Sequence, residues 1–237
     1  SFFLVYLIRC ICIKYSILDQ PNLRSSHQEP VALMGGIGII VSVCISGMIF
    51  FPEFIFDYPL IIISLFCLAI VSVCDDIWTV PSLLRLMVHI GVGVSFYVSD
   101  ILLSAIELPF GSIVLSFVGF LSVIMTIFYV VSWINVYNFM DGMDGYAAMM
   151  AVIGLGCLGF LSFQSGGVDI VQMMMVLVSA VAGFWVWNYP KAKIFMGDVG
   201  SAILGALVAL ITLKLNQLSV GEGGVFLWQS LLIFSIF

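Results

Sequence analysis

The segment with the clearest chemical signature is 135–145, which reads NVYNFMDGMDG. Asn138, Asp141 and Asp144 follow one another at intervals of three residues, so on a helical turn they would share a face. The glycine after each aspartate allows a sharp turn and a close approach of a ligand to the backbone. The segment therefore predicts a polar binding or catalytic site.

Two further acidic groups lie elsewhere in the chain. Asp75 and Asp76 are adjacent at the end of an apolar run, and their carboxylates repel each other unless a cation lies nearby. They indicate a metal or acid–base site, with a solvated helix end as the alternative. Asp198 opens another apolar run within 194–201, IFMGDVGS, where a helix start would offer free N–H groups to a phosphate. A simple N-cap is the alternative for Asp198.

Together these aspartates would form a strongly anionic face, which would repel a phosphate substrate unless a divalent cation bridged them. Mg²⁺ suits this task because it binds hard oxygen ligands, often one or two carboxylates plus substrate phosphates. The alternative is that the carboxylates bind a transported cation.

Basic residues near these segments add possible phosphate contacts. Arg24 and His27, in the polar stretch 19–34, could meet a phosphate. Arg85 lies on an apolar run, where a charged side chain usually faces a partner or a cavity, so we expect it to contact a lipid phosphate or the acids. The alternative for Arg85 is snorkelling to the headgroups. His89, four residues later, is interpreted as a hydrogen-bonded packing residue.

The elements that must position these residues are membrane helices. The chain of 237 residues is 63% hydrophobic and only 8% charged, whereas soluble domains carry about 25% charged residues. The apolar runs are continuous and do not alternate, which favours helices over a barrel and predicts an all-α polytopic bundle. Thirteen acidic against seven basic residues argue against nucleic acid as a partner.

About nine spans are expected in one integral-membrane domain, 1–237. The chain begins with Ser1 and stops at Phe237 inside an apolar run, so we expect a fragment truncated at both ends. The expected spans are 1–18, 35–52, 58–74, 82–99, 113–134, 146–163, 169–187, 199–215 and a ninth from about 226.

The alternation of the spans places the three acidic groups on one side of the membrane. Most basic residues lie in or beside the connections on that side, and only Lys214 lies near the other. By the positive-inside rule this side is cytoplasmic. The acids of the other side are scattered singly and are interpreted as solvated loop groups. The stretch 101–109 is expected to be an outer loop or a short interfacial helix. The glycines of 35–38 open a span and suit close helix packing.

Five ordered motifs resemble a known family: DQPNLRSSH at 19–27, GGIG at 35–38, DD at 75–76, NVYNFMDGMDG at 135–145 and FMGDVGS at 195–201. The chain resembles the bacterial polyprenyl-phosphate N-acetylhexosamine-1-phosphate transferases, glycosyltransferase family 4, and within them the O-antigen-type branch. Val31 to Met34 stand where the family often has a basic Pro-Thr-Pro-Arg-like run.

The resemblance implies a reaction and its setting. A UDP-sugar would donate a sugar 1-phosphate to undecaprenyl phosphate, giving undecaprenyl-diphospho-sugar and UMP and initiating cell-surface polysaccharide synthesis. It implies Mg²⁺ as cofactor, with Mn²⁺ as the alternative ion. It also implies a bacterial inner-membrane protein of ten or eleven spans with a cytoplasmic active site, in contact with membrane lipids, and leaves a homodimer open.

The resemblance also implies roles for individual residues. Asp198 and Asp141 match metal-site aspartates, and Asp75, Asp76 and Asp141 match catalytic positions. Substrate contacts fall to Asn138, Asp144 and Phe195, with Phe195 matching an aromatic that stacks on uracil. The further substrate contacts expected at Arg24, His27 and Arg85 follow from residue type and position. The family's His/Arg-rich loop after the ninth span would lie beyond Phe237. Three alternatives stay open: the lipid I-forming phospho-MurNAc-pentapeptide transferase, a cation-coupled transporter, and a non-catalytic membrane protein.

Overall fold

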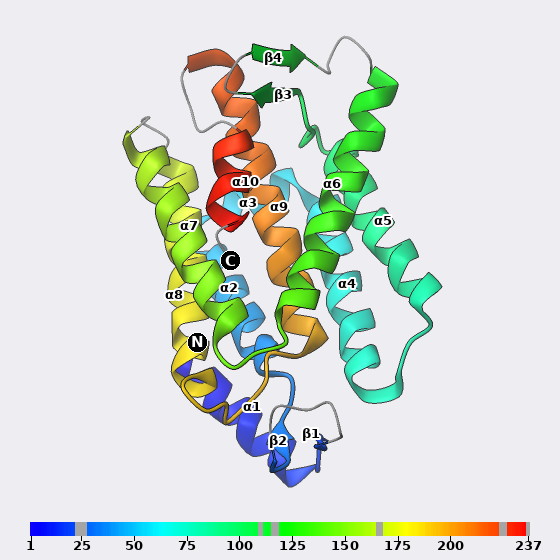
Figure 1. Cartoon of the computed structure of the whole chain (residues 1–237), viewed down its shortest axis with the longest axis vertical. Coiled ribbons are helices and arrows are strands. Elements are labelled where there is room, and N and C mark those ends of the chain that lie inside the picture. Colours follow the sequence, from blue (N-terminus) through cyan, green and yellow to red (C-terminus); the bar gives the residue numbers. More distant parts are fainter. Residues whose placement is uncertain (22–27, 109–110, 115–118, 165–167, 223–226, 236–237) are drawn as a thin grey trace.

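Long apolar helices make up most of the chain. The computed structural model describes residues 1–21, 28–108, 111–114, 119–164, 168–222 and 227–235. The helices in this part of the chain are α1 (Phe2–Lys14), α2 (Gly35–Phe50), α3 (Pro52–Asp57), α4 (Pro59–Trp78), α5 (Ser82–Val98), α6 (Gly119–Met140), α7 (Tyr146–Gln164), α8 (Val168–Asn188), α9 (Gly197–Glu222) and α10 (Leu227–Ser235). Figure 1 shows them as a bundle of roughly parallel and antiparallel helices.

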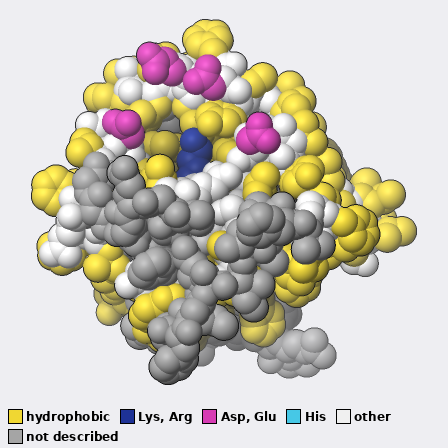
Figure 2. All heavy atoms as spheres, turned by 90° about the horizontal axis from the view of Figure 1, so that it is seen from above, with side chains coloured by type: hydrophobic (Ala, Val, Ile, Leu, Met, Phe, Trp, Pro, Cys, Tyr) yellow, Lys and Arg dark blue, Asp and Glu magenta, His cyan; other side chains and the backbone are white. Residues whose placement is uncertain are grey.

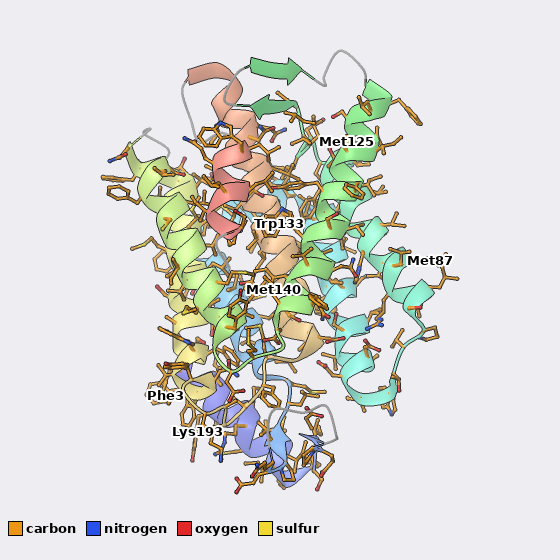
Figure 3. The ribbon with its side chains drawn as sticks, in the orientation of Figure 1. Phe3, Met87, Met125, Trp133, Met140 and Lys193 are labelled. Carbon is orange, nitrogen blue, oxygen red and sulfur yellow. The ribbon has the colours of Figure 1, made fainter. Side chains whose placement is uncertain are left out.

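The bundle has the dimensions of a membrane protein. Among the described residues five helices, α4 and α6 to α9, are long and apolar enough to cross a bilayer, and α2 and α5 are apolar but shorter. Its outer surface is apolar: Met87 points away from the bundle and is 61% exposed, whereas Trp133 points inward and is 8% exposed (Figure 3). The predicted all-α polytopic membrane fold is confirmed, and the number of nine spans stays a prediction.

Helix α9 is the core of the bundle. In the apolar 18-residue stretch of α9, 83% of the residues are buried, against 17–44% in the corresponding stretches of the four other long helices. Helices α2, α4 and α6 pack around it (Figure 1). Small residues permit this contact: a Cβ on Gly36 would lie 2.2 Å from Cα of Gly200, and one on Gly205 would lie 2.8 Å from Cα of Ile134. The first turn of α9 therefore lies where the ends of several helices meet.

Two antiparallel strand pairs interrupt the helical pattern. The first joins β1 (Leu18–Asp19) to β2 (Val31–Ala32), and the second joins β3 (Ala105–Leu108) to β4 (Gly111–Val114). The interfacial helix, one of two alternatives expected over 101–109, is therefore wrong for residues 105–108, because these residues form a strand that pairs with residues 111–114. The span expected over 113–134 begins later, at Gly119.

Two helices that carry site residues end later in the chain than expected. Helix α4 runs through Asp75 and Asp76 to Trp78, and α6 runs through Asn138 to Met140. Residues 135–145 lie between two expected spans and were therefore expected to connect them. This prediction is wrong for residues 135–140, which belong to α6. A polar residue is tolerated in a membrane helix when a neighbouring element satisfies its side chain, and the site supplies such partners.

The end of the bundle that carries β3 and β4 has a different charge pattern. Figure 2 shows acidic side chains that stand apart from one another around its rim, and a basic side chain in a hollow between them. Lys214, near the outer end of α9, lies over the rings of Phe54 and Tyr58, with Nζ 5.0 Å and 4.5 Å from their centroids. The clustered aspartates lie at the other end of α9.

Candidate active site

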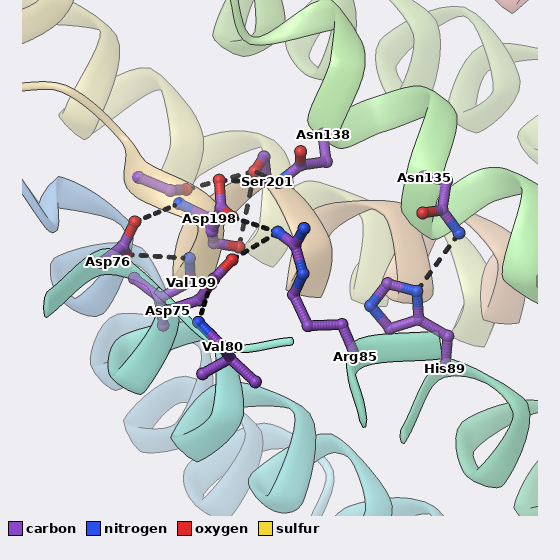
Figure 4. Close-up of polar contacts among 11 residues, drawn as sticks. Asp75, Asp76, Val80, Arg85, His89, Asn135, Asn138, Asp198, Val199 and Ser201 are labelled. Carbon is purple, nitrogen blue, oxygen red and sulfur yellow. Dashed lines mark hydrogen bonds and ion pairs between the residues drawn. The ribbon is translucent and has the colours of Figure 1, made fainter. Parts of the chain in front are cut away.

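Four helices bring the predicted site residues together. Asp75 and Asp76 come from the last turn of α4, Asp198 from the first turn of α9, Asn138 from the last turn of α6 and Arg85 from α5 (Figure 4). Residues separated by more than 100 positions thus share one network of hydrogen bonds and ion pairs at one end of the bundle.

Asp76 accepts hydrogen bonds from the first turn of α9. Its Oδ1 accepts the N–H of Asp198 at 2.9 Å and its Oδ2 accepts the N–H of Val199 at 3.3 Å. Gly197 has φ of +77°, and a Cβ on it would lie 2.7 Å from Oδ2 of Asp76. A glycine is needed there for both reasons. The expectation that these N–H groups are free for a phosphate is therefore wrong, because a carboxylate of the protein occupies them.

Asp75 has a different set of partners. Its Oδ2 is ion-paired with Arg85, and its Oδ1 accepts the N–H of Val80 at 2.6 Å. The same Arg85 Nη1 lies 3.4 Å from Oδ2 of Asp198. The Asp75 side chain is only 6% exposed, whereas those of Arg85 and Asp198 are 38% and 37% exposed. Arg85 therefore contacts the acids and still faces open space, while its contact with a lipid phosphate stays a prediction.

Asn138 connects the end of α6 to the start of α9. Its Nδ2 donates to Oδ1 of Asp198 at 2.9 Å and to Oγ of Ser201 at 3.1 Å. Asp141 begins the turn after α6 and is half-buried. Burial first, and then the charges of Asp198 and Asp76, raise the pKa of Asp141 well above its ordinary value. The carboxyl of Asp141 thus lies within electrostatic reach of the cluster.

Asp144 is not held in this cluster. Its Oδ2 accepts the N–H of Ala192 at 3.0 Å, so it fastens the turn after α6 to the segment before α9. Buried Asn188 joins the same two segments, since its Oδ1 accepts the N–H of Gly145 at 2.7 Å and its Nδ2 donates to the carbonyl of Ile194 at 2.9 Å. The shared helical face expected for Asn138 and Asp144 is therefore wrong, because the helix ends at Met140.

The remaining predicted residues lie around this framework. Phe195 is half-buried, and its backbone N–H donates to the carbonyl of Ala32 at 2.8 Å while its carbonyl accepts the N–H of Gly35 at 2.8 Å. Stacking of Phe195 on a base stays a prediction. Arg24 and His27 lie outside the described residues.

Sequence reasoning left two polar residues, Asn188 and Asn135, out of the site. Asn188 acts through the contacts given above. Nδ2 of Asn135 lies 3.2 Å from Nδ1 of His89, one helical turn beyond Arg85 (Figure 4). The signals were present in the sequence, since Asn135 belongs to the NVYNFMDGMDG segment and His89 follows Arg85 at helical spacing.

The carboxylates fit a hard divalent cation. Asp198 and Asp141 are the residues that would hold it, because Asp198 is partly exposed and Asp141 lies within electrostatic reach of it. Within the described residues no three His, Cys, Asp or Glu side chains come together as a metal cage. Mg²⁺ usually binds through one or two protein carboxylates and takes its other ligands from substrate phosphates and water.

The comparisons with known proteins place this site in a family. The model of glycosyl transferase family 4 matches residues 58–216, about two thirds of the chain. The chain is 27% identical over 211 residues to a probable undecaprenyl-phosphate N-acetylglucosaminyl 1-phosphate transferase of Bacillus subtilis, covering 87% of this chain and 58% of that protein. It is 28% identical over 220 residues to an undecaprenyl-phosphate alpha-N-acetylglucosaminyl 1-phosphate transferase of Yersinia pestis, covering 90% and 59%.

A shorter match links the chain to another branch. It is 35% identical over 100 residues to a phospho-N-acetylmuramoyl-pentapeptide-transferase of Streptococcus agalactiae, covering 42% of this chain and 30% of that protein. The chain thus spans less than two thirds of the length of each of these relatives. The family match contains every described acidic residue of the site, from Asp75 to Asp198. The chain therefore belongs to glycosyl transferase family 4.

Proposed function

We propose that the protein of which this chain is part transfers a sugar 1-phosphate from a UDP-sugar to undecaprenyl phosphate, with Mg²⁺ as cofactor. The sugar is of the N-acetylhexosamine type, and the product is undecaprenyl-diphospho-sugar. The observation that carries the proposal is the convergence of Asp75, Asp198, Arg85 and Asn138 at one end of a membrane bundle. The printed activities of the relatives from Bacillus subtilis and Yersinia pestis support it.

The position of the site suits two substrates of opposite solubility. The phosphate of a polyprenyl phosphate lies at headgroup level, where the membrane helices end, while a nucleotide sugar arrives from water. The basic residues near this end support a cytoplasmic orientation in the bacterial inner membrane. A transported cation, in contrast, is usually bound near the bilayer midplane on broken helices, and the described carboxylates of the site lie at helix ends.

The reaction is a displacement at phosphorus. An oxygen of the acceptor phosphate forms a bond to the sugar-linked phosphorus, and the bond from that phosphorus to the bridging oxygen breaks, so that UMP leaves with this oxygen. Such chemistry needs positioning and charge neutralisation more than covalent help. We therefore infer a single direct step, and trapping of a phosphorylated aspartate would contradict it.

Each residue of the site has its own role in this reaction. Asp75 orients the guanidinium of Arg85, and the Arg85 side chain is 38% exposed, so that it can also contact a phosphate. Asn138 fixes Asp198 from the opposite side, and Asp76 fixes the turn that carries it. When bound, Mg²⁺ supplies positive charge to the phosphates. Asp141 and Asp198 would hold the ion, and Phe195 is the candidate for contact with the uracil ring.

The test follows UMP release by the full-length gene product from UDP-N-acetylglucosamine and undecaprenyl phosphate with Mg²⁺. Asp198→Asn keeps the shape of the side chain and removes its charge, and we expect it to lower kcat at least about 100-fold, as loss of one major electrostatic contact does. Asp169→Asn is the matched control, because Asp169 is also an acidic residue in the first turn of an apolar helix, at the other end of the bundle. Equal turnover by both variants would contradict the assignment of Asp198.

The lipid I-forming transferase is the second candidate, favoured by the 100-residue match to the Streptococcus agalactiae relative. The same assay separates the two donors. Turnover with UDP-N-acetylmuramoyl-pentapeptide but not with UDP-N-acetylglucosamine would establish the second candidate and overturn the first.

A further inference from the structure

A polar pair lies on the membrane side of the active site, between α5 and α6. Nδ2 of Asn135 lies 3.2 Å from Nδ1 of His89 and also donates to the carbonyl of Val131 at 2.7 Å (Figure 4). Asn135 is exposed and His89 is half-buried. The function proposed above gives this pair no role.

The pair continues the active site by one helical turn. His89 follows Arg85 by four positions on α5, and Asn135 precedes Asn138 by three positions on α6, so each pair of residues shares a helix face. Arg85 and Asn138 both contact Asp198, at 3.4 Å and 2.9 Å. The His89–Asn135 contact is therefore a second polar connection between α5 and α6, deeper in the membrane than the first.

The space between the two helices closes immediately beyond this pair. One turn further along α5, a Cβ on Gly93 would lie 2.9 Å from Cα of Ile127, so the backbones of α5 and α6 are in close contact there. Toward the active site the two helices diverge (Figure 1). His89 and Asn135 thus lie one turn along α5 from the close contact of the two helices, on the side toward the aspartates.

The surroundings of the pair are those of a lipid-facing surface. Near Asn135 on α6, Val136 is 51% exposed and Phe139 is 86% exposed, and on α5 Met87 is 61% exposed. An amide at such a position is costly in hydrocarbon unless it is hydrogen-bonded, and here the carbonyl of Val131 and the imidazole of His89 satisfy it. A polar contact that only packs helices together is expected to be less exposed. The contact between the hydroxyls of Ser64 and Ser95, which lie 2.7 Å apart between α4 and α5, is an example, because it is partly buried.

The contacts also fix the protonation pattern of the imidazole. The carbonyl of Val131 can only accept, so the Asn135 atom facing it is the amide nitrogen. This nitrogen can only donate, so Nδ1 of His89 accepts and the imidazole proton lies on Nε2. Figure 4 shows the Nε2 edge turned toward the Arg85 side chain. Among the described residues no hydrogen bond engages Nε2.

We propose that His89 is the membrane-side contact of the acceptor phosphate, with Nε2–H donating to a phosphate oxygen that Arg85 also binds, and that Asn135 is the positioning residue that fixes this donor. The ligand class is a phosphate monoester on a long apolar chain, which would enter laterally between α5 and α6. This inference rests on the proposed function, since the acceptor is the lipid of that reaction.

The test separates acceptor binding from donor binding in the full-length protein in detergent. Gln can place an N–H where His89 has Nε2, whereas Asn places one nearer Nδ1, so the two substitutions form a matched pair. We expect His89→Asn to raise KM for undecaprenyl phosphate about 10- to 100-fold, the effect of losing a hydrogen bond to a charged group. We expect His89→Gln to stay within about threefold of wild type, and KM for the UDP-sugar to change less than about twofold in both.

Asn135→Leu and Ser95→Ala complete the series. Asn135→Leu frees the imidazole to rotate, so we expect a rise in the acceptor KM that is smaller than that of His89→Asn. Ser95→Ala removes a polar contact of the same helix away from the site and should leave both KM values unchanged. An unchanged acceptor KM in His89→Asn, or a rise in the donor KM alone, would overturn the proposal.

A direct binding measurement distinguishes failure of this inference from failure of the proposed function. A fluorescent polyprenyl phosphate, with the corresponding polyprenol as the phosphate-free probe, is titrated into wild type and His89→Asn. We expect the variant to bind the phosphate probe about 10-fold or more weakly and the polyprenol equally. If the wild type releases no UMP from any UDP-sugar, the proposed function fails, and equal binding of the phosphate probe by both proteins would overturn this inference independently.

Discussion

Adjacent residues in the site have different partners. Both oxygens of Asp76 accept N–H groups from the first turn of α9, whereas Asp75 is ion-paired with Arg85. Successive side chains on a helix point about 100° apart, so two neighbouring aspartates reach different elements. The two aspartates look equivalent in sequence, but Asp76 caps the start of α9 and Asp75 is the ion-pair partner of Arg85. The carboxylate of Asp76 also matches the positive end of the α9 dipole.

This difference predicts a loss of stability at Asp76. Asp76→Asn removes the charge and turns an amide group toward at least one N–H of α9, so we expect the free energy of unfolding to fall by about 1–2 kcal/mol. Thermal unfolding in detergent measures the change. Glu53→Gln, at the start of α3 on the other end of the bundle, is the control and should be neutral. Loss of turnover at unchanged stability would show that Asp76 acts in chemistry and not as a cap.

At the scale of elements, the position of Asp198 depends on how closely α2 approaches α9. Gly36 faces Gly200, and the N–H of Gly36 donates to the carbonyl of Met196 at 2.9 Å. A parallel bridge between Ala32 and Ile194 continues the contact. The glycines of the second span therefore serve helix packing, and this packing holds the segment that ends in Asp198.

Two glycines of α2 give a matched test of this contact. In Gly36→Ala the new Cβ would lie 2.2 Å from Cα of Gly200, so the helices must separate. We expect a destabilisation of about 1–3 kcal/mol, the usual cost of overpacking, together with a fall in turnover. Gly47→Ala has nothing within 4 Å of the new Cβ. It should be neutral or stabilising by up to about 1 kcal/mol. Equal unfolding temperatures for the two variants would contradict the packing role of Gly36.

At the scale of the whole molecule, charge is separated between the two ends of an apolar bundle. One end gathers Asp75, Asp76, Asp141 and Asp198, of which Asp75 and Asp198 are ion-paired with Arg85, whereas at the other end the described acidic side chains stand apart (Figure 2). The central helix α9 connects these ends, with Asp198 in its first turn and Lys214 near its outer end. The site must therefore face one aqueous compartment only.

Reporter fusions test which compartment this is. We expect a fusion after Thr79, beside the site, to give a fluorescent cytoplasmic reporter and an inactive alkaline phosphatase. A fusion after Asp57, at the end of α3, should give the opposite pair of results, because α4 lies between the two points. The physical reason is the excess of basic residues near the site end. The reverse pattern would place the site outside and exclude a cytoplasmic nucleotide sugar as its substrate.

Much of the fold and the membership of the site could be predicted from sequence. Continuous apolar runs specify membrane helices, because in lipid the backbone must form its hydrogen bonds within the protein and these runs lack the alternation of barrel strands. The acidic segments were identified from residue type and spacing. The β3–β4 pair could not be predicted in this way, because short strands gain their stability from the partner segment. The end of α6 at Met140 was also missed, since Asn138 is tolerated in the helix only through its contacts with Asp198 and Ser201.

Composition and residue spacing predicted a membrane bundle with a phosphate-type site at one end. Solvation explains this, because lipid selects long apolar helices and excludes charge to their ends. The different partners of the individual aspartates, in contrast, follow from how the helices pack. Hydrogen bonds and ion pairs depend on distances of about 3 Å, and packing around α9 sets those distances between residues far apart in the chain. The pairing of His89 with Asn135 was decided in the same way.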